Sequence, residues 1–297
     1  MPGTERTLAP AGLFDRPGFI PEAGDLSAWR GAVVGLTGGR GVLGSLLLER
    51  LGQLGIRAEA YAGNVNDAAA LAAWFADQEF SHCFHFAALV PVGEVESDPL
   101  RAFETNVIGT FNVCRQLVLT QPDCWLFYCS SSHVYQPTGN PDPISEEGAT
   151  VPATFYGETK LAAERVVAVL CGKLQRPYCI GRVFSFTHAR QAAPYLVPNL
   201  RERIAALRDG ATLEIQNPAS VRDIQDAEHV IDAILALAER RAAGIINIGT
   251  GVGLTVREIA LRVAQSLGRQ ISVTGVDRGK PAALIADTTR LRGLLSV

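Results

Sequence analysis

T-G-G-R-G-V-L-G, the stretch from Thr37 to Gly44, decides the fold of this chain. It follows an apolar run, A-V-V-G-L, and opens a segment whose apolar residues recur with helical spacing. A strand, a glycine-rich turn and a helix in this order begin a dinucleotide-binding βαβ unit. Gly38 suits the tight turn, Gly41 leaves room for a pyrophosphate, and Gly44 lets helix and strand pack closely. The helix N-terminus would face the phosphate charge, although a glycine turn of this kind can also be purely structural.

Composition limits the class of protein. A chain of 297 residues with 47% hydrophobic and 19% charged residues can bury a sizeable core. A net charge of -3 argues against nucleic acid or a membrane surface as a partner. The six cysteines include no C-x-x-C pair, which favours buried thiols over disulfides or zinc. No apolar run approaches a membrane span, and the N-terminus does not resemble a signal peptide, so we expect a cytoplasmic protein.

Strand and helix signals alternate along most of the chain. Predicted strands lie at 32–36, 57–61, 81–88, 125–132, 178–184 and 244–248; predicted helices lie at 45–54, 68–77, 99–118, 155–170, 197–207, 227–239 and 255–267. This alternation predicts an α/β fold, a Rossmann-type doubly wound parallel sheet with a smaller α/β C-terminal substrate lobe. We predict an N-terminal arm (1–30), a dinucleotide-binding domain (31–185 and 223–250) and a substrate-binding lobe (186–222 and 251–297).

Three polar residues predict the chemistry. Tyr156 and Lys160 are four residues apart in a helical segment, so they share one face. A free phenol has a pKa of about 10, and lowering it to about 7 requires roughly 4 kcal/mol of differential stabilisation. A nearby ammonium and the cationic nicotinamide ring could supply it. Ser131 precedes Tyr156 by 25 residues (156 − 131) at a strand end, where it could bond the same substrate oxygen.

In this order, T-G-G-R-G-V-L-G, F-H-F-A-A, N-V-I-G-T, S-S-S-H-V-Y and Y-G-E-T-K resemble the extended short-chain dehydrogenase/reductase (sugar-nucleotide epimerase/dehydratase) superfamily. The resemblance covers nearly the whole chain past residue 31. It implies that Ser131, Tyr156 and Lys160 are the catalytic residues and that Lys160 also holds the nicotinamide ribose.

The glycine turn and the resemblance together imply a cofactor site. Its members are Gly38, Arg40, Gly41, Val42, Leu43, Gly44, Asn64, Val65, Ala87, Ala88, Asn106, Ser130, Tyr156 and Lys160. Asn64 and Val65 are expected at the adenine, where the family usually has Asp in place of Asn64. Ala87 and Ala88 end a strand, and small residues there let a flat cofactor lie close to the backbone.

The second half of the chain more closely resembles GDP-4-keto-6-deoxy-mannose reductases, through G-R-V-F-S-F-T-H, V-R-D and the segment from Arg278 to Asp287. The implied substrate-binding residues are Ser132, His133, Ser185, Asn217, Arg222 and Arg278. In such enzymes the positions of Arg222 and Arg278 hold the diphosphate or ribose, a role that suits a guanidinium group. Each arginine could instead be a solvated surface charge. Ser185 stands where the family usually has Asn.

The residues around the second strand favour NADP, with NAD as the alternative. A site for NAD usually places an acid at the tip of this strand, and a site for NADP places a cation there. The tip here is Y-A-G, without an acid, and Arg40 in the glycine turn could reach a 2′-phosphate. Glu59, earlier in the strand, is the contrary feature.

The leading functional prediction is an NADP-dependent reductase of the 4-keto group of a nucleotide-linked 4-keto-6-deoxyhexose. The alternatives are an NAD-dependent sugar-nucleotide 4-epimerase and a non-catalytic nucleotide-sensing member of the fold. His133 could be an acid or base near the sugar, or a substrate contact. No histidine spacing implies a metal. Helices near 98–119 and 155–171 resemble those that pair in homodimers of the family, which predicts a homodimer.

Overall fold

A six-stranded parallel sheet forms the centre of the chain, in the order β2-β1-β3-β4-β5-β9. The computed structural model describes residues 13–14, 29, 31–278 and 281–295. The strands of the sheet are β1 (Val33–Thr37), β2 (Arg57–Tyr61), β3 (His82–His85), β4 (Trp125–Ser131), β5 (Tyr178–Val183) and β9 (Gly244–Ile248). The Rossmann-type α/β fold predicted from the alternation of elements is confirmed.

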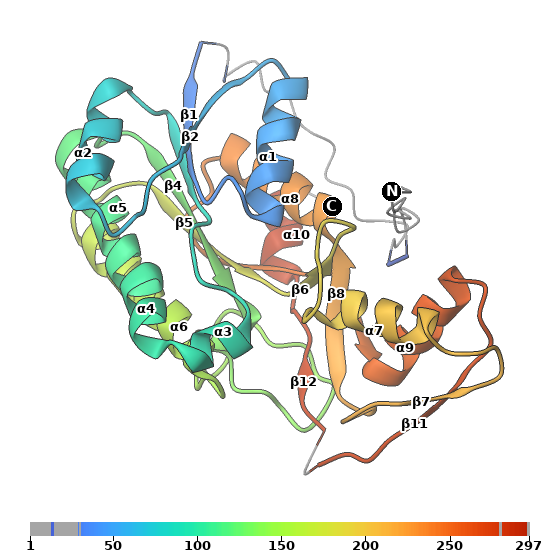
Figure 1. Ribbon diagram of the computed structural model, residues 1–297. Helices are drawn as coiled ribbons and strands as arrows, with labels where there is room; N and C mark the ends of the chain where they lie inside the picture. The colour runs from blue at the N-terminus through green and yellow to red at the C-terminus, as the bar shows by residue number, and fades with distance from the viewer. Residues whose placement is uncertain (1–12, 15–28, 30, 279–280, 296–297) are drawn as a thin grey trace.

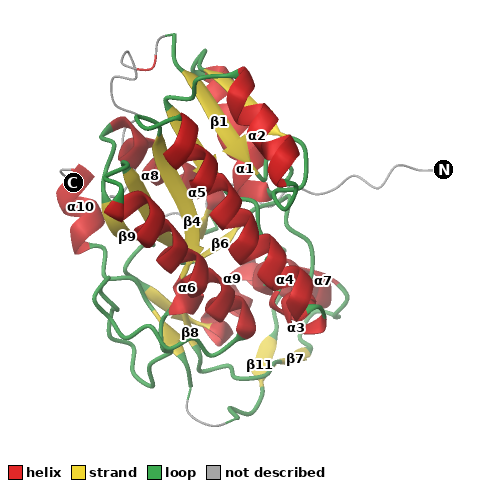
Figure 2. Cartoon of the chain, turned by 90° about the vertical axis from the view of Figure 1, so that its left-hand side faces the viewer, coloured by secondary structure: helices red, strands yellow, loops and turns green. Residues whose placement is uncertain are grey.

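Helices cover both faces of this sheet (Figures 1 and 2). The helical segments of this part are α1 (Val42–Gln53), α2 (Ala68–Asp77), α3 (Val92–Ser97), α4 (Pro99–Phe103), η2 (Glu104–Ile108), α5 (Gly109–Thr120), η3 (Ser132–Val134), α6 (Phe155–Val167), η4 (Ala168–Gly172), α8 (Ala227–Glu239) and α10 (Thr289–Leu295). One apolar cluster joins α1, α8 and α10 to the sheet, and a second joins α2, α5 and α6 to its other face.

The strands are apolar on both sides because both faces are covered. In β4, Trp125 and Phe127 point into the cluster with α1 and α8, whereas Leu126 and Tyr128 point into the cluster with α5 and α6. This alternation follows from the two-residue period of a strand. It fixes the register of β4, because a slip of one residue would exchange the two faces.

A second lobe follows the sheet. Its strands are β6 (Ser185–Thr187), β7 (Thr212–Glu214), β8 (Val221–Asp226), β10 (Gly253–Thr255), β11 (Ser272–Thr274) and β12 (Ala283–Leu284), and its helices are α7 (Leu196–Ala205) and α9 (Val256–Ser266). β8 pairs with β10, β12 and β6, while β7 pairs with β11. The predicted domain boundaries remain predictions.

Most of the predicted N-terminal arm lies outside the described residues, but two aromatic side chains of the arm are described. Phe14 is buried in the apolar cluster of the second lobe with α7 and α9. Trp29 is buried under the sheet and stacks on His82, with ring centroids 4.2 Å apart. These two side chains therefore pack against different parts of the chain.

Two predicted elements differ from the structure, and two observed elements were not predicted. The strand predicted at 81–88 ends at His85, because the following residues turn away to line a pocket. The helix predicted at 99–118 is interrupted by a π-helical turn at Glu104–Ile108. α3 and the six-residue strand β8 were not predicted, because neither shows a long apolar period.

The topology locates the functional site. From β1 the chain moves to β2 on one side of β1, and from β3 onward it moves to the other side. In open α/β sheets, ligands bind at the carboxyl ends of the strands where the order reverses in this way. Among the described residues, no helix is both long and apolar enough to span a membrane.

Candidate active site

The glycine turn joins β1 to α1 at the point where the strand order reverses. Gly38 has a φ of +78°, and a Cβ there would approach the backbone N of Ala87 to 2.5 Å. A Cβ on Gly44 would come within 2.3 Å of the Gly38 carbonyl oxygen, so α1 packs tightly on the turn. α1 begins at Val42 with no side-chain cap, and its first residues line a pocket. The N–H groups of this first turn form an anion-binding end.

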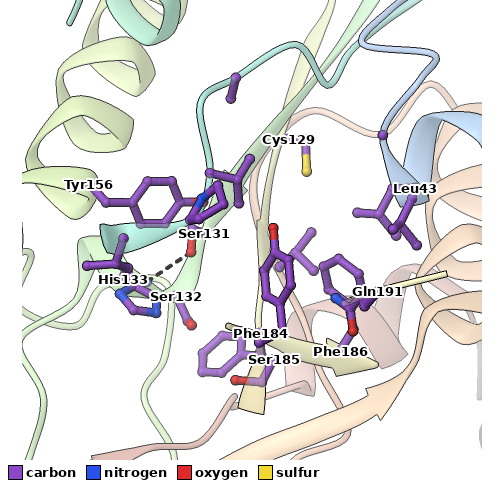
Figure 3. A pocket seen from close by; sticks show the side chains of 18 of the residues that line it. Leu43, Cys129, Ser131, Ser132, His133, Tyr156, Phe184, Ser185, Phe186 and Gln191 are labelled. Atoms are coloured by element: carbon purple, nitrogen blue, oxygen red, sulfur yellow. Dashed lines mark hydrogen bonds between the residues drawn. The ribbon is translucent and has the colours of Figure 1, made fainter. Parts of the chain in front are cut away.

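This pocket, of about 490 Å³, lies between the glycine turn and the second lobe. Fourteen of the predicted site residues line it: Gly38, Gly41, Val42, Leu43, Gly44, Ala88, Ser130, Ser131, Ser132, His133, Tyr156, Lys160, Ser185 and Arg222. Figure 3 shows Tyr156, Ser131 and His133 together, with Leu43 across the pocket from them.

Tyr156 and Ser131 meet where β4 ends beside the first turn of α6. Thr154 caps this helix by accepting a hydrogen bond from the backbone N of Gly157. Ser131 Oγ accepts a hydrogen bond from the backbone N of His133 at 3.2 Å. Burial raises the pKa of Tyr156 well above its ordinary value, and a hydrogen bond with Ser131 partly offsets this rise. The pair can therefore direct a phenol and a hydroxyl at one substrate oxygen.

Lys160 lies one helical turn after Tyr156 and is also buried. Its ammonium lies 4.7 Å from the centroid of the Tyr128 ring, a cation–π contact. Burial lowers the pKa of Lys160, and Cys129 and Glu164 oppose this effect. The helix thus places Tyr156, Lys160 and Glu164 at intervals of four residues along one face.

A buried ion pair lies beneath these residues. Arg182 on β5 and Glu164 on α6 form a salt bridge of 2.8 Å, and the side chain of each is 4% exposed. Ser130 donates a hydrogen bond of 2.5 Å to the same carboxylate. Arg182 also donates to the carbonyl of Glu146 and stacks on Tyr135. This network joins the end of β4, which carries Ser131, to the helix that carries Lys160.

The substrate side of the pocket combines an imidazole with a guanidinium. The rings of His133 and Tyr156 meet edge to face, with centroids 5.4 Å apart. Burial, with a smaller contribution from Arg222, lowers the pKa of His133 to about 4. The imidazole is therefore neutral near pH 7. Arg222 is held by hydrogen bonds from its Nη1 to the carbonyls of Val221 and Ala282.

Two other predicted substrate residues lie outside the pocket lining but next to each other. The side-chain oxygen of Asn217 accepts a hydrogen bond of 2.7 Å from the backbone N of Arg278. Asn217 itself has a positive φ of 51°. The predicted substrate contact of each residue stays a prediction.

Five predicted cofactor residues also lie outside the pocket lining. Arg40 reaches the tip of β2, where it donates to the carbonyl of Ala62 at 2.7 Å. The Asn64 side chain accepts from the backbone N of Asn66, and the Val65 side chain is buried among α2 and α5. The Ala87 backbone packs on Gly38, and the Asn106 amide bonds the backbone of Leu89 and the Thr159 hydroxyl. Asn106 therefore contacts the loop beside the pocket instead of the pocket itself.

Sequence reasoning missed about half of the pocket lining. Most of the missed residues are apolar or aromatic: Phe86, Val90, Pro91, Val92, Gly93, Cys129, Val183, Phe184, Phe186, Gln191, Pro194, Tyr195, Leu196, Val197 and Ile224. Many of them come from the loop after β3 or the loop after β6. Neither loop carries a residue pattern that points to chemistry. Among the described residues, no three His, Cys, Asp or Glu side chains are grouped so that they could hold a metal ion.

Together, the parallel sheet, the glycine turn and the Ser131, Tyr156 and Lys160 cluster define a dinucleotide-binding α/β class of protein. The model of the NAD-dependent epimerase/dehydratase family matches residues 34–249, so the chain belongs to that family. It is thus an NAD(P)-dependent enzyme of the extended short-chain dehydrogenase/reductase type.

Comparison with individual proteins places the chain among sugar-nucleotide enzymes. It is 27% identical to a UDP-glucose 4-epimerase of Halalkalibacterium halodurans over 257 residues, which cover 79% of this chain and 76% of the relative. A UDP-glucose 4-epimerase of Thermus thermophilus in complex with NAD has a TM-score of 0.77 and 23% identity, covering 88% of this chain and 92% of the other. RMD from Pseudomonas aeruginosa complexed with NADPH has a TM-score of 0.80 and 21% identity, covering 89% and 92%.

The pocket fits the nicotinamide dinucleotide that the family implies. The glycines of the turn, an uncapped helix N-terminus and Ala88 leave room for a flat group and a pyrophosphate. The closer resemblance to GDP-4-keto-6-deoxy-mannose reductases stays a prediction.

Proposed function

We propose that the enzyme is a nucleotide-sugar 4-epimerase. The observation that carries the proposal is that Ser131, Tyr156 and Lys160 line the same pocket as the glycine turn. The family and the similarity to UDP-glucose 4-epimerases support it. These relatives favour the epimerase over the reductase that we expected from the sequence.

The chemistry would proceed through a 4-keto sugar. The Tyr156 phenolate accepts the proton of the C4 hydroxyl, and Ser131 donates a hydrogen bond to the same oxygen. Lys160 favours the phenolate electrostatically and holds the nicotinamide ribose. A bound nicotinamide supplies the hydride acceptor and then the hydride donor. The ketone turns its other face to the cofactor, and Tyr156 returns the proton to the C4 oxygen, so no nicotinamide is consumed overall.

A specific observation supports the reductase as a second candidate. Arg40 lies at the tip of β2, where a guanidinium could bind a 2′-phosphate. Glu59, the acid on that strand, already forms an ion pair of 3.0 Å with Arg57. These contacts favour NADP, which a reductase would exchange at each turnover.

Two assays with the purified enzyme separate the candidates. For the epimerase we expect NAD released on denaturation and conversion of UDP-glucose to UDP-galactose without net absorbance change at 340 nm. For the reductase we expect stoichiometric loss of NADPH with GDP-4-keto-6-deoxy-mannose or its dTDP-linked counterpart. An enzyme that carries tightly bound NAD but converts none of these sugars would contradict both substrate assignments.

We also propose a homodimer formed through α4, η2, α5 and η4. Large apolar side chains are exposed on these neighbouring segments, among them Leu100 (78%), Leu119 (64%) and Val169 (52%). Figure 2 shows α4 and α5 following each other along one axis, with α6 beside them. Exposed apolar surface of this kind often marks a protein interface. Light scattering should give twice the chain mass, and Leu100→Asp with Leu119→Asp should give a monomer; a wild-type monomer contradicts the proposal.

A further inference from the structure

A chain of buried hydrogen bonds crosses the sheet beneath the cofactor site. Thr37 Oγ1 lies 2.6 Å from His85 Nδ1, and His85 Nε2 lies 2.9 Å from Thr110 Oγ1. Thr110 Oγ1 donates to the backbone carbonyl of Asn106 at 2.6 Å. All four residues are buried, so water does not compete for these bonds.

The backbone carbonyl of Asn106, at one end of this hydrogen-bond chain, determines where each of its protons lies. A carbonyl oxygen only accepts, so Thr110 must use its single proton on Asn106. Thr110 Oγ1 can then only accept from His85, which places the imidazole proton on Nε2. Nδ1 of the neutral ring must therefore accept, and Thr37 donates to it. Burial, with a smaller contribution from Lys160, lowers the pKa of His85 to about 3 and keeps the ring neutral.

The Thr37 end of the hydrogen-bond chain lies next to the glycine turn. Thr37 directly precedes Gly38, and its hydroxyl oxygen accepts a hydrogen bond of 3.4 Å from the backbone N of Ala87. The backbone of Ala87 packs directly on Gly38, where a Cβ would clash. His85 thus bonds the residue that holds the glycine turn and the loop after β3 together.

The Asn106 end of the hydrogen-bond chain lies next to α6, the helix that carries Tyr156. The Asn106 amide donates to the Thr159 hydroxyl at 3.0 Å, and Thr159 donates to the backbone carbonyl of Tyr156 at 2.8 Å. The same amide bonds the backbone of Leu89, in a loop that borders the pocket. Polar groups therefore connect the glycine turn to the residue proposed to move the proton.

We propose that His85 is a positioning residue that, as the Nε2–H tautomer, fixes the glycine turn and the Tyr156 helix relative to each other. Loss of the ring loosens the cofactor cleft and Tyr156 together. The inference uses the proposed nicotinamide site but no particular sugar. Binding of the cofactor and the tautomer of His85 therefore test it independently of the epimerase assignment.

His82 provides a matched control. It lies on the same strand, is also buried, and has its pKa lowered to about 4, mainly by burial. It occupies the other end of β3, where it stacks on Trp29 and pairs with Ser81. A substitution of His82 therefore removes a buried imidazole without touching the hydrogen-bond chain.

Two measurements test the proposal. Long-range ¹H–¹⁵N NMR of the full chain should show His85 as the Nε2–H tautomer from pH 5 to pH 9; the Nδ1–H tautomer, or a protonated ring at pH 6, overturns the assignment. Fluorescence titration with NADH and NADPH should give a Kd at least tenfold higher for His85→Phe. We expect a change of less than threefold for His85→Gln, whose amide can donate and accept, and of less than twofold for His82→Phe.

Equal effects of His85→Phe and His82→Phe on Kd, or no effect of either, would overturn the proposal. Thr110→Val provides a second route if His85→Phe does not fold. It removes the Thr110 hydroxyl from the same hydrogen-bond chain, on the α5 side and outside the pocket lining, and should raise Kd at least threefold. An unchanged Kd for a folded Thr110→Val variant would also overturn the proposal.

Discussion

Replacement of Glu164 by Leu removes the acid of the buried ion pair without changing the surface. Arg182 would keep its charge with its side chain 4% exposed and lose three nitrogen–oxygen contacts of 2.8 to 3.3 Å. Removal of one partner of a buried pair costs about 3–5 kcal/mol, since the remaining charge is not compensated. For a chain of this size, that loss lowers Tm by roughly 10 °C. Ser130, the neighbour of Ser131, would also lose its acceptor.

Urea unfolding followed by circular dichroism measures this loss. The exposed pair of Arg57 and Glu59 gives the control, with side chains 59% and 42% exposed. Glu59→Leu should change the unfolding free energy by less than about 0.5 kcal/mol, because exposed pairs contribute little. Glu164→Leu combined with Arg182→Leu should recover at least about 2 kcal/mol relative to Glu164→Leu alone. A cost below about 1 kcal/mol for Glu164→Leu, or additive effects in the double variant, would refute the reasoning.

Three further predictions follow from the site. Tyr156→Phe should abolish turnover but leave the Kd for NADH within about threefold, because Phe keeps the ring in the site and only the hydroxyl that moves the proton is lost; retained turnover in the sugar assay would contradict this role. Arg40→Ala should weaken NADPH binding at least about tenfold and NADH binding less than about twofold, since a guanidinium favours the 2′-phosphate; equal losses in the two titrations would contradict this. Burial lowers the pKa of His82 and His133 from 6.5 to about 4 and of His85 to about 3. Between about pH 4 and pH 6.5, these rings therefore bind protons in the unfolded chain but not in the folded one. Their stabilisation is therefore present above pH 6.5 and is lost as pH falls toward 4, by about 4 kcal/mol per pH unit near pH 5 for three protons; denaturation midpoints that stay flat from pH 6.5 to pH 4.5 would contradict it.

The fold was predictable because its strongest signals are local. The ranges predicted for β2, α2, α8 and β9 agree with the structure residue for residue. Asp67 caps α2 through its own side chain, and α8 is apolar on almost every turn, so a short window of sequence contains the cause of each helix. The φ of Gly38 and the contact of Gly44 with the Gly38 carbonyl are equally local, whereas the contact of Gly38 with Ala87 forms only in the finished sheet.

The apolar wall of the pocket and its supporting network were not predictable from local sequence. Arg182 and Glu164 are 18 residues apart, and Thr37 and His85 are 48 apart, so only the finished sheet brings them together. His85 lies in an apolar strand and is buried, so nothing in its local sequence distinguishes it from an ordinary core histidine. Its role depends on a threonine from β1 and another from α5, which no spacing rule connects.

The raised pKa of Tyr156 shows why this network matters for chemistry. A base that works near neutrality needs a phenol pKa near 7, and burial shifts Tyr156 in the opposite direction. Each pKa unit corresponds to about 1.4 kcal/mol, so the compensating charge must lie close and stay fixed. Lys160 is one turn away, and the buried Glu164 helps this lysine to keep its proton. Glu164 in turn is held by Arg182, which cannot lose its own charge. The ion pair therefore supports the reactive tyrosine through the lysine, so the stability lost in Glu164→Leu and any rise in the pKa of the pH–rate profile should appear in the same variant.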